Sequence, residues 1–166
     1  MSTFHPASHL CEDEWGAHHS VAGDAPRSRL YTALMDLGTP DSSDRSLTIY
    51  ELLGEDYFHR LAAAFYEGVK EDEVLLPMYP EEDLSGAQDR LTWFLIQYFG
   101  GPALFNQNRG APMLRRRHTP YEVTEEAQEH WLACMRRALD VAETPDTLRP
   151  QMEAYFTRAA AAMRNR

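Results

Sequence analysis

His118 is the side chain of this sequence best suited to bind a cofactor. It ends the run Arg115-Arg116-Arg117-His118 and precedes Thr119-Pro120, so we expect a short, stiff segment around it rather than a helix interior. The arginines are unusual in a chain with a net charge of −10, and they would suit an anionic group on a molecule that the imidazole binds. Trp131 follows in the next helical stretch. Together these residues favour a cofactor ligand over a structural histidine.

The segment from Arg109 to Arg117 contains four arginines and no acidic residue, whereas the whole chain has 26 acidic and 16 basic residues. A local basic patch on an acidic protein usually has a local role, although a solvated loop is the simpler interpretation. Two functional hypotheses follow. Either the arginines neutralise a cofactor, or the chain is a non-enzymatic helical interaction module that uses the Arg109–Arg117 loop to bind an acidic partner. The second hypothesis predicts no pigment and binding that weakens steeply with salt.

Length and composition predict one globular domain, since 166 residues with 43% apolar side chains can form a single core. The net charge of −10 argues against a nucleic-acid or anionic-membrane partner, and no apolar stretch is long enough to span a bilayer. The two cysteines, Cys11 and Cys134, are far apart and show no metal-type spacing, which disfavours a disulfide framework. No secretory signal is visible. We therefore expect a cytoplasmic protein.

Residues 1–46 differ in composition from the rest of the chain. They are rich in Ser, Pro, Gly, Asp and His, and only residues 30–35 look able to pack, so we predict a flexible N-terminal extension followed by a domain over residues 47–166. The potential metal ligands of this segment are His5, His9, Cys11, His18 and His19. Their spacing matches no zinc pattern, which favours an unstructured tail over a metal site.

From Leu47 onward the apolar residues recur at helical spacing, and no alternating run typical of a strand is present. This pattern predicts an all-α fold. Helices are expected at 47–53, 55–70 and 84–98, then from Thr124 onward and again from Thr144-Pro145. Two prolines make residues 74–80 a packed turn, and residues 102–120 are predicted to be a loop. Thr124 should cap its helix, because Glu125 and Glu126 then lie favourably in the first turn.

A helical domain with a large apolar interior and a histidine in a loop is compatible with haem binding. Haem needs a neutral imidazole for its iron, an apolar slot for the macrocycle and cations for its propionates. His118 would supply the imidazole, and the slot would be lined by Ala87, Leu91, Phe94 and Leu114. The candidate cations are Arg90, Arg109, Arg115 and Arg117. From these residues alone, a plain helical binding module remains the alternative.

Several short stretches between Leu47 and Met163 match a known family in both order and spacing. They are Phe65-Tyr66, Glu71-Asp72-Glu73-Val74-Leu75, Tyr79-Pro80-Glu81-Glu82-Asp83-Leu84-Ser85-Gly86-Ala87, Arg90-Leu91, Gln97-Tyr98-Phe99-Gly100-Gly101-Pro102, Arg109-Gly110, Arg117-His118 and Trp131-Leu132-Ala133-Cys134-Met135. Through them the chain resembles the group II truncated haemoglobins. The resemblance implies a two-over-two helical sandwich around a b-type haem (iron protoporphyrin IX), with His118 as the iron ligand on the proximal side.

The resemblance also implies which residues surround the haem. On the opposite, distal side it places Tyr66, Tyr79 and Trp131, whose hydroxyl and indole hydrogens could donate to a bound ligand with partial negative charge. Further haem contacts are expected from Ala87, Arg90, Leu91, Phe94, Tyr98, Arg109, Leu114 and Arg117. Ala87 stands where globins often carry a polar residue. Its methyl group cannot donate a hydrogen bond to the ligand, and its small size leaves a path by which the ligand can enter.

Each assignment has a structural alternative. Without the resemblance, Trp131, Tyr66 and Tyr79 are interpreted as ordinary core residues, and Cys134 as a small buried apolar group. His59 is expected at the surface, and His130 should point away from Trp131 on the same helix. One departure from the family is that Gly54 is followed by Glu55 where a Gly-Gly pair is expected.

The function implied by the resemblance is reversible binding of O2 and of other small ligands such as NO, CO, sulfide and peroxide. Three distal donors should slow the release of O2, which suits ligand chemistry or sensing better than bulk oxygen transport. NO or peroxide detoxification, as a dioxygenase-like or peroxidase-like side activity, is one hypothesis. It would need an unidentified reductase, because the sequence has no flavin or nicotinamide motif. A homo-oligomer is compatible with the sequence.

Overall fold

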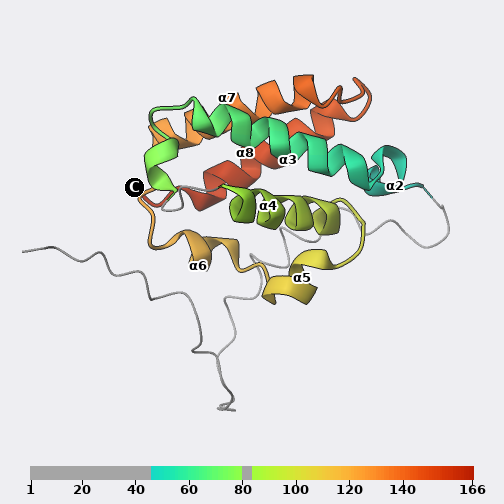
Figure 1. Cartoon of the computed structure of the whole chain (residues 1–166), viewed down its shortest axis with the longest axis horizontal. Coiled ribbons are helices and arrows are strands. Elements are labelled where there is room, and N and C mark those ends of the chain that lie inside the picture. The colour runs from blue at the N-terminus through green and yellow to red at the C-terminus, as the bar shows by residue number, and fades with distance from the viewer. Residues whose placement is uncertain (1–45, 80–83) are drawn as a thin grey trace, which may run out of the picture. The chain divides into compact units, whose positions relative to one another are not determined.

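The computed structural model describes residues 46–79 and 84–166. Within these residues every regular element is helical and none is a strand, which confirms the predicted all-α class. The elements are α2 (Ile49–Leu53), α3 (Glu55–Lys70), the 3-10 helix η1 (Leu76–Met78), α4 (Ser85–Tyr98), α5 (Leu104–Arg109), α6 (Leu114–His118), α7 (Glu125–Val141) and α8 (Arg149–Met163) (Figure 1). No helix in this part of the chain is long and apolar enough to cross a membrane.

Several predictions concern residues outside those that the structure describes. They are residues 1–45 of the flexible extension that is predicted over residues 1–46, its potential metal ligands His5, His9, Cys11, His18 and His19, and residues 80–83 of the matching stretches. These remain predictions.

The four longest helices form two pairs, α3 with α4 and α7 with α8, and the pairs meet where α3 packs against α7. In Figure 1, α3, α7 and α8 lie above α4, and the short helices α5 and α6 lie below it. This arrangement is the predicted two-over-two helical sandwich.

The core is built from aromatic side chains at helical spacing. Phe58 and Phe65 of α3 are fully buried, and the ring of Phe65 lies 5.2 Å from that of Trp131 on α7. Helices α3 and α7 approach closely at Gly68, where an added Cβ would lie 3.4 Å from the sulfur of Cys134. Cys134 is buried in this contact, as the sequence predicts.

Two helix starts show why the chain becomes helical where it does. At α2, Thr48 Oγ1 accepts from Glu51 N at 3.1 Å while Thr48 N donates to the Glu51 carboxylate at 2.8 Å, which is a capping box. At α7, Thr124 Oγ1 accepts from Ala127 N at 3.1 Å, so the predicted cap is confirmed. Between α2 and α3 the chain turns at Gly54, whose φ of 77° is readily adopted only by glycine. One glycine is therefore enough for the turn between α2 and α3, although the family pattern has a Gly-Gly pair there.

Two predictions about the second half of the chain are wrong. Residues 102–120 are not a continuous loop, because they contain α5 and α6, and His118 is the last residue of α6 rather than a loop residue. The last helix begins at Arg149, four residues beyond Pro145. Both short helices are held by tertiary contacts. For example, Phe105 of α5 is buried against Phe94 of α4, with ring centroids 5.9 Å apart.

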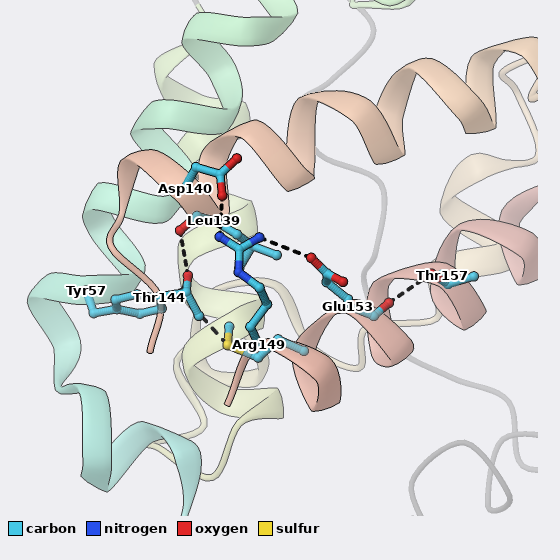
Figure 2. A network of polar contacts seen from close by, with 8 residues as sticks. Tyr57, Leu139, Asp140, Thr144, Arg149, Glu153 and Thr157 are labelled. Carbon is cyan, nitrogen blue, oxygen red and sulfur yellow. Dashed lines mark hydrogen bonds and ion pairs between the residues drawn. The ribbon is translucent and has the colours of Figure 1, made fainter. Parts of the chain in front are cut away.

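The corner between α7 and α8 is fixed by a buried polar network (Figure 2). Thr144 Oγ1 donates to Leu139 O at 2.8 Å, so its single hydrogen is used and it must accept from the Tyr57 hydroxyl at 2.6 Å. Nearby, Arg149 is paired with Asp140 and with Glu153, the latter at 3.1 Å. The Tyr57–Thr144 bond joins the start of α3 to this corner.

We expect Thr144→Val to lower the free energy of unfolding by about 1–3 kcal/mol, because it leaves the buried Tyr57 hydroxyl and the Leu139 carbonyl without this partner. Urea unfolding followed by circular dichroism measures the change. Thr157→Val is the matched control, since the exposed Thr157 hydroxyl donates to the Glu153 carbonyl at 2.9 Å. It should cost no more than about 0.5 kcal/mol. Equal losses in the two variants would contradict the importance of the buried network.

Candidate functional site

The imidazole of His118 is held in one orientation by the helix that carries it. Its Nδ1 lies 2.8 Å from the carbonyl oxygen of Leu114, one turn earlier in α6. A carbonyl can only accept, so Nδ1 carries the hydrogen of the neutral ring and Nε2 carries the lone pair. The ring is partly buried. In its neutral form, His118 therefore presents Nε2 as an oriented nitrogen base, which is what an iron ligand requires.

Arg117 holds the segment that leads into α6. Its Nε donates to Pro112 O at 2.8 Å, and its Nη2 donates to Arg109 O at 2.8 Å and to Ala111 O at 3.3 Å. The guanidinium also lies over the ring of Phe105, 5.5 Å from its centroid. Burial, together with the charge of Arg109, lowers the pKa of Arg117. Arg117 thus acts as a clamp on the α5–α6 connection, a role that the sequence did not reveal.

The two predicted distal tyrosines lie together. Tyr66 of α3 is buried, and its ring meets that of Tyr79 edge to face with centroids 5.7 Å apart. Burial raises the pKa of Tyr79, while a hydrogen bond with the Tyr66 side chain acts in the opposite direction. Tyr79 therefore remains a neutral phenol with a hydrogen to donate at neutral pH.

Trp131 is connected to these tyrosines through Phe65. The ring of Phe65 lies 5.2 Å from Trp131 and 5.1 Å from Tyr66. Trp131 also lies near Phe156 of α8, with ring centroids 6.0 Å apart. The indole is only partly buried, although its neighbours belong to the core.

The predicted lining residues of α4 share one face. Ala87, Leu91, Phe94 and Tyr98 recur every three or four residues, which places them on one side of a helix. Ala87 and Phe94 are buried, whereas Leu91 and Tyr98 are partly exposed, as is Leu114 of α6. Tyr98 also stacks on Tyr155 of α8 with centroids 3.7 Å apart, so it contributes to the core as well.

The remaining predicted arginines differ in their surroundings. Arg90 of α4 is close enough to Tyr79 for its charge to act on that hydroxyl. Arg109 and Arg115 have exposed side chains on α5 and α6. Within residues 109–117, Arg117 therefore binds the backbone, whereas the side chains of Arg109 and Arg115 are exposed to solvent.

Asp72 and His130 form a contact beside the predicted distal residues, and this contact was not predicted from the sequence. One carboxylate oxygen of Asp72 accepts from Val74 N at 3.0 Å and Leu75 N at 2.9 Å, and the other lies 2.8 Å from His130 Nδ1. The first pair holds the turn that leads to η1 and Tyr79. The second ties that turn to α7, next to Trp131. An aspartate two or three residues before the amides it binds is a recognisable turn signal, but its histidine partner is not visible in sequence.

The Asp72–His130 contact shifts both groups toward their charged forms. The hydrogen bond with Asp72 is the largest cause that raises the pKa of His130, and Glu126 and Glu129 add to it. Burial would raise the pKa of Asp72, but the hydrogen bonds from His130, Leu75 and Val74 outweigh it and lower that pKa. The interaction is therefore an ion pair when His130 is protonated.

We expect the stabilisation from this ion pair to be complete between pH 3.8 and 6.5, the ordinary pKa values of the two groups. It should be lost as the pH rises through the raised pKa of His130, and as the pH falls through the lowered pKa of Asp72. His130→Gln should therefore lower the free energy of unfolding more in that window than at alkaline pH, as measured by urea unfolding.

His59→Gln is the control for this pH dependence. His59 lies 3.8 Å from Glu55 on an exposed surface, where an ion pair contributes little. A His130→Gln effect that is the same at all pH values would contradict the ion pair.

Known proteins resemble this chain over the same region. The model of the family described as bacterial-like globin matches residues 48–165. The chain is 42% identical over 91 residues to the group 2 truncated hemoglobin YjbI of Bacillus subtilis (strain 168), covering 55% of this chain and 68% of that protein.

Solved structures agree in fold. The thermostable hemoglobin from the actinobacterium Thermobifida fusca has 50% sequence identity and a TM-score of 0.70, covering 72% of this chain and 98% of that one. The truncated oxygen-avid haemoglobin from Bacillus subtilis has 35% identity and a TM-score of 0.69, covering 72% of this chain and all of that one (100%). The residues that match in order, the helical sandwich and these likenesses agree: the chain belongs to the bacterial-like globin family and is a group II truncated haemoglobin.

Proposed function

We propose that this chain binds haem b through Nε2 of His118 and reversibly binds O2 on the distal side of the haem. The observation that carries the proposal is the hydrogen bond from His118 Nδ1 to the Leu114 carbonyl at 2.8 Å, because it leaves Nε2 as an oriented base. Family membership supports the cofactor, and the oxygen-avid relative supports the ligand. Family membership also favours haem binding over the alternative of a helical module that binds an acidic partner.

Several partly buried apolar residues of the candidate site could cover a large, flat apolar group. Leu91, Tyr98, Leu114, Tyr79 and Trp131 all pack on the core, yet each retains exposed surface. A macrocycle would cover such surface and exclude water from it. Ala87 and the buried Phe94 complete the face of α4. When bound, haem supplies the iron on which a small ligand is held, and the protein supplies everything around it.

The distal side chains would stabilise a ligand that carries partial negative charge. The rings of Tyr66 and Tyr79 lie edge to face with centroids 5.7 Å apart, and their hydroxyls are two of the proposed donors to the ligand. The indole N–H of Trp131 is the third proposed donor. Donors held in a water-poor pocket stabilise such charge more strongly than water does.

Cations near the pocket would hold the two propionates. Arg109 and Arg115, whose side chains are exposed, and Arg90, which acts on Tyr79, are the proposed candidates. Arg117 donates through Nε and Nη2 to backbone carbonyls. Arg117 would then act mainly by fixing α6. Turnover of NO or peroxide at the same site would require a reductase as electron donor, and CO and sulfide would compete as ligands.

Equilibration of the reduced, haem-loaded protein with O2 tests the proposal. We expect the absorption spectrum to change on addition of O2 and to return when O2 is removed, with sharp isosbestic points. Immediate irreversible oxidation, or no spectral change, would contradict reversible O2 binding. Adding NO or peroxide with and without an electron donor then determines whether the site turns over these substrates.

A further inference from the structure

The backbone of His118 is bound by a side chain from the other end of the domain. Asn165, which follows α8, donates through Nδ2 to His118 O at 3.3 Å and to Tyr121 O at 2.9 Å. Its Oδ1 accepts from Val123 N at 3.0 Å. The main chain joins the same segment, since Asn165 N donates to Val123 O at 3.0 Å. The amide of Asn165 is therefore fully engaged with the residues directly after the candidate iron ligand.

Helix α6 needs contacts of this kind to keep its place. It has only five residues, and a helix this short is unstable in isolation. Arg117 fixes the segment before α6 through Arg109, Ala111 and Pro112. Asn165 fixes the segment after α6. Between these two clamps, the position of His118 depends on bonds that the helix itself cannot make.

We propose that Asn165 is a positioning residue for the iron ligand, which holds the main chain of His118 so that its imidazole keeps one distance and orientation toward the haem iron. The proposal rests on haem binding by His118. Partners that orient a metal ligand from the outer shell typically contribute 10–100-fold to metal affinity. Asn165 binds the backbone carbonyl of His118 and not its ring. Replacing Asn165 should therefore leave the hydrogen bond between Nδ1 and the Leu114 carbonyl, and with it the tautomer of the ring, unchanged.

Two variants of Asn165 test the proposal in the full-length, haem-loaded protein. Asn165→Ala removes the whole amide, whereas Asn165→Asp keeps an acceptor for Val123 N but no longer donates to the carbonyls of His118 and Tyr121. In both, the ion pair between Arg164 and Glu125 at 3.1 Å still holds the end of the chain near α7. Circular dichroism checks that each variant is folded.

Two measurements report on the iron ligand itself. The first is the rate at which haem transfers to an excess of a colourless acceptor globin, which we expect to rise roughly 10-fold in both variants. The second is the iron–histidine stretching frequency of the reduced protein by resonance Raman spectroscopy, which we expect to shift or broaden. A purely structural role would lower thermal stability without moving this frequency.

Asn108→Ala is the matched control. Asn108 lies on α5, and its Nδ2 donates to Leu104 O at 2.8 Å, so the variant also removes an exposed amide-to-carbonyl bond. It should leave both measurements unchanged. If the wild-type protein binds haem but both Asn165 variants match Asn108→Ala, the positioning role is wrong. If the wild-type protein itself binds no haem, the proposed function fails and the positioning role fails with it.

Discussion

Replacing His118 with alanine should abolish the wild-type Soret spectrum of the haem-loaded protein. The variant loses the only protein atom proposed to bond the iron, so haem affinity should fall by more than the roughly 10–100-fold that loss of an outer-shell partner costs. The fold should survive, because the imidazole is only partly buried at the end of α6. Titration of the haem-free protein with haem, followed at the Soret band, measures the change.

His59→Ala is the control for this experiment, since it removes an exposed imidazole on α3 that is not part of the site. It should bind haem as the wild-type protein does. Free imidazole should restore the spectrum of His118→Ala by occupying the vacated position. A His118→Ala variant with wild-type spectrum and affinity would show that another residue bonds the iron.

Replacing Trp131 with phenylalanine should accelerate O2 dissociation by about 10–100-fold. A hydrogen bond to a charged acceptor contributes about 1.5–3 kcal/mol, and each 1.4 kcal/mol corresponds to a tenfold change. Phenylalanine keeps an aromatic ring against Phe65 and Phe156, so the loss is confined mainly to the indole N–H. Rapid mixing of the oxygenated protein with an O2 scavenger measures the rate.

Trp93→Phe controls for the loss of indole bulk, because Trp93 is a partly buried tryptophan of α4 outside the proposed distal set. Its O2 dissociation rate should match that of the wild-type protein. An unchanged rate in Trp131→Phe would mean that the indole donates nothing, and the hydroxyls of Tyr66 and Tyr79 would then carry the stabilisation.

The long helices could be predicted because each has an apolar face at helical spacing. Helix α3 was predicted over 55–70 and the structure has Glu55–Lys70. The start of α7 was predicted from Thr124, whose side chain is a local signal for a cap. Helices α5 and α6 could not be predicted in this way. They have six and five residues, which is too short for a periodic pattern, and they form because Phe105 and Arg117 find partners elsewhere.

The candidate site was predicted in its residue types but not in its contacts. The order of Tyr66, Tyr79, Ala87 and His118 along the chain contributes to the resemblance to group II truncated haemoglobins, and it is this resemblance that predicts a haem pocket. The sequence could not show that Arg117 binds backbone carbonyls, since the carbonyl of every residue is a potential acceptor. For the same reason it could not show that Asn165 reaches back 47 residues to His118. Such contacts depend on how distant helices meet.

The central claim is that this chain holds one haem through His118, and titration of the haem-free protein with haem tests it most directly. We predict that a Soret band will grow linearly and saturate at one haem per chain, and that His118→Ala will show no such saturation. Absence of a Soret band in the folded wild-type protein, or equal saturation in His118→Ala, would contradict the claim.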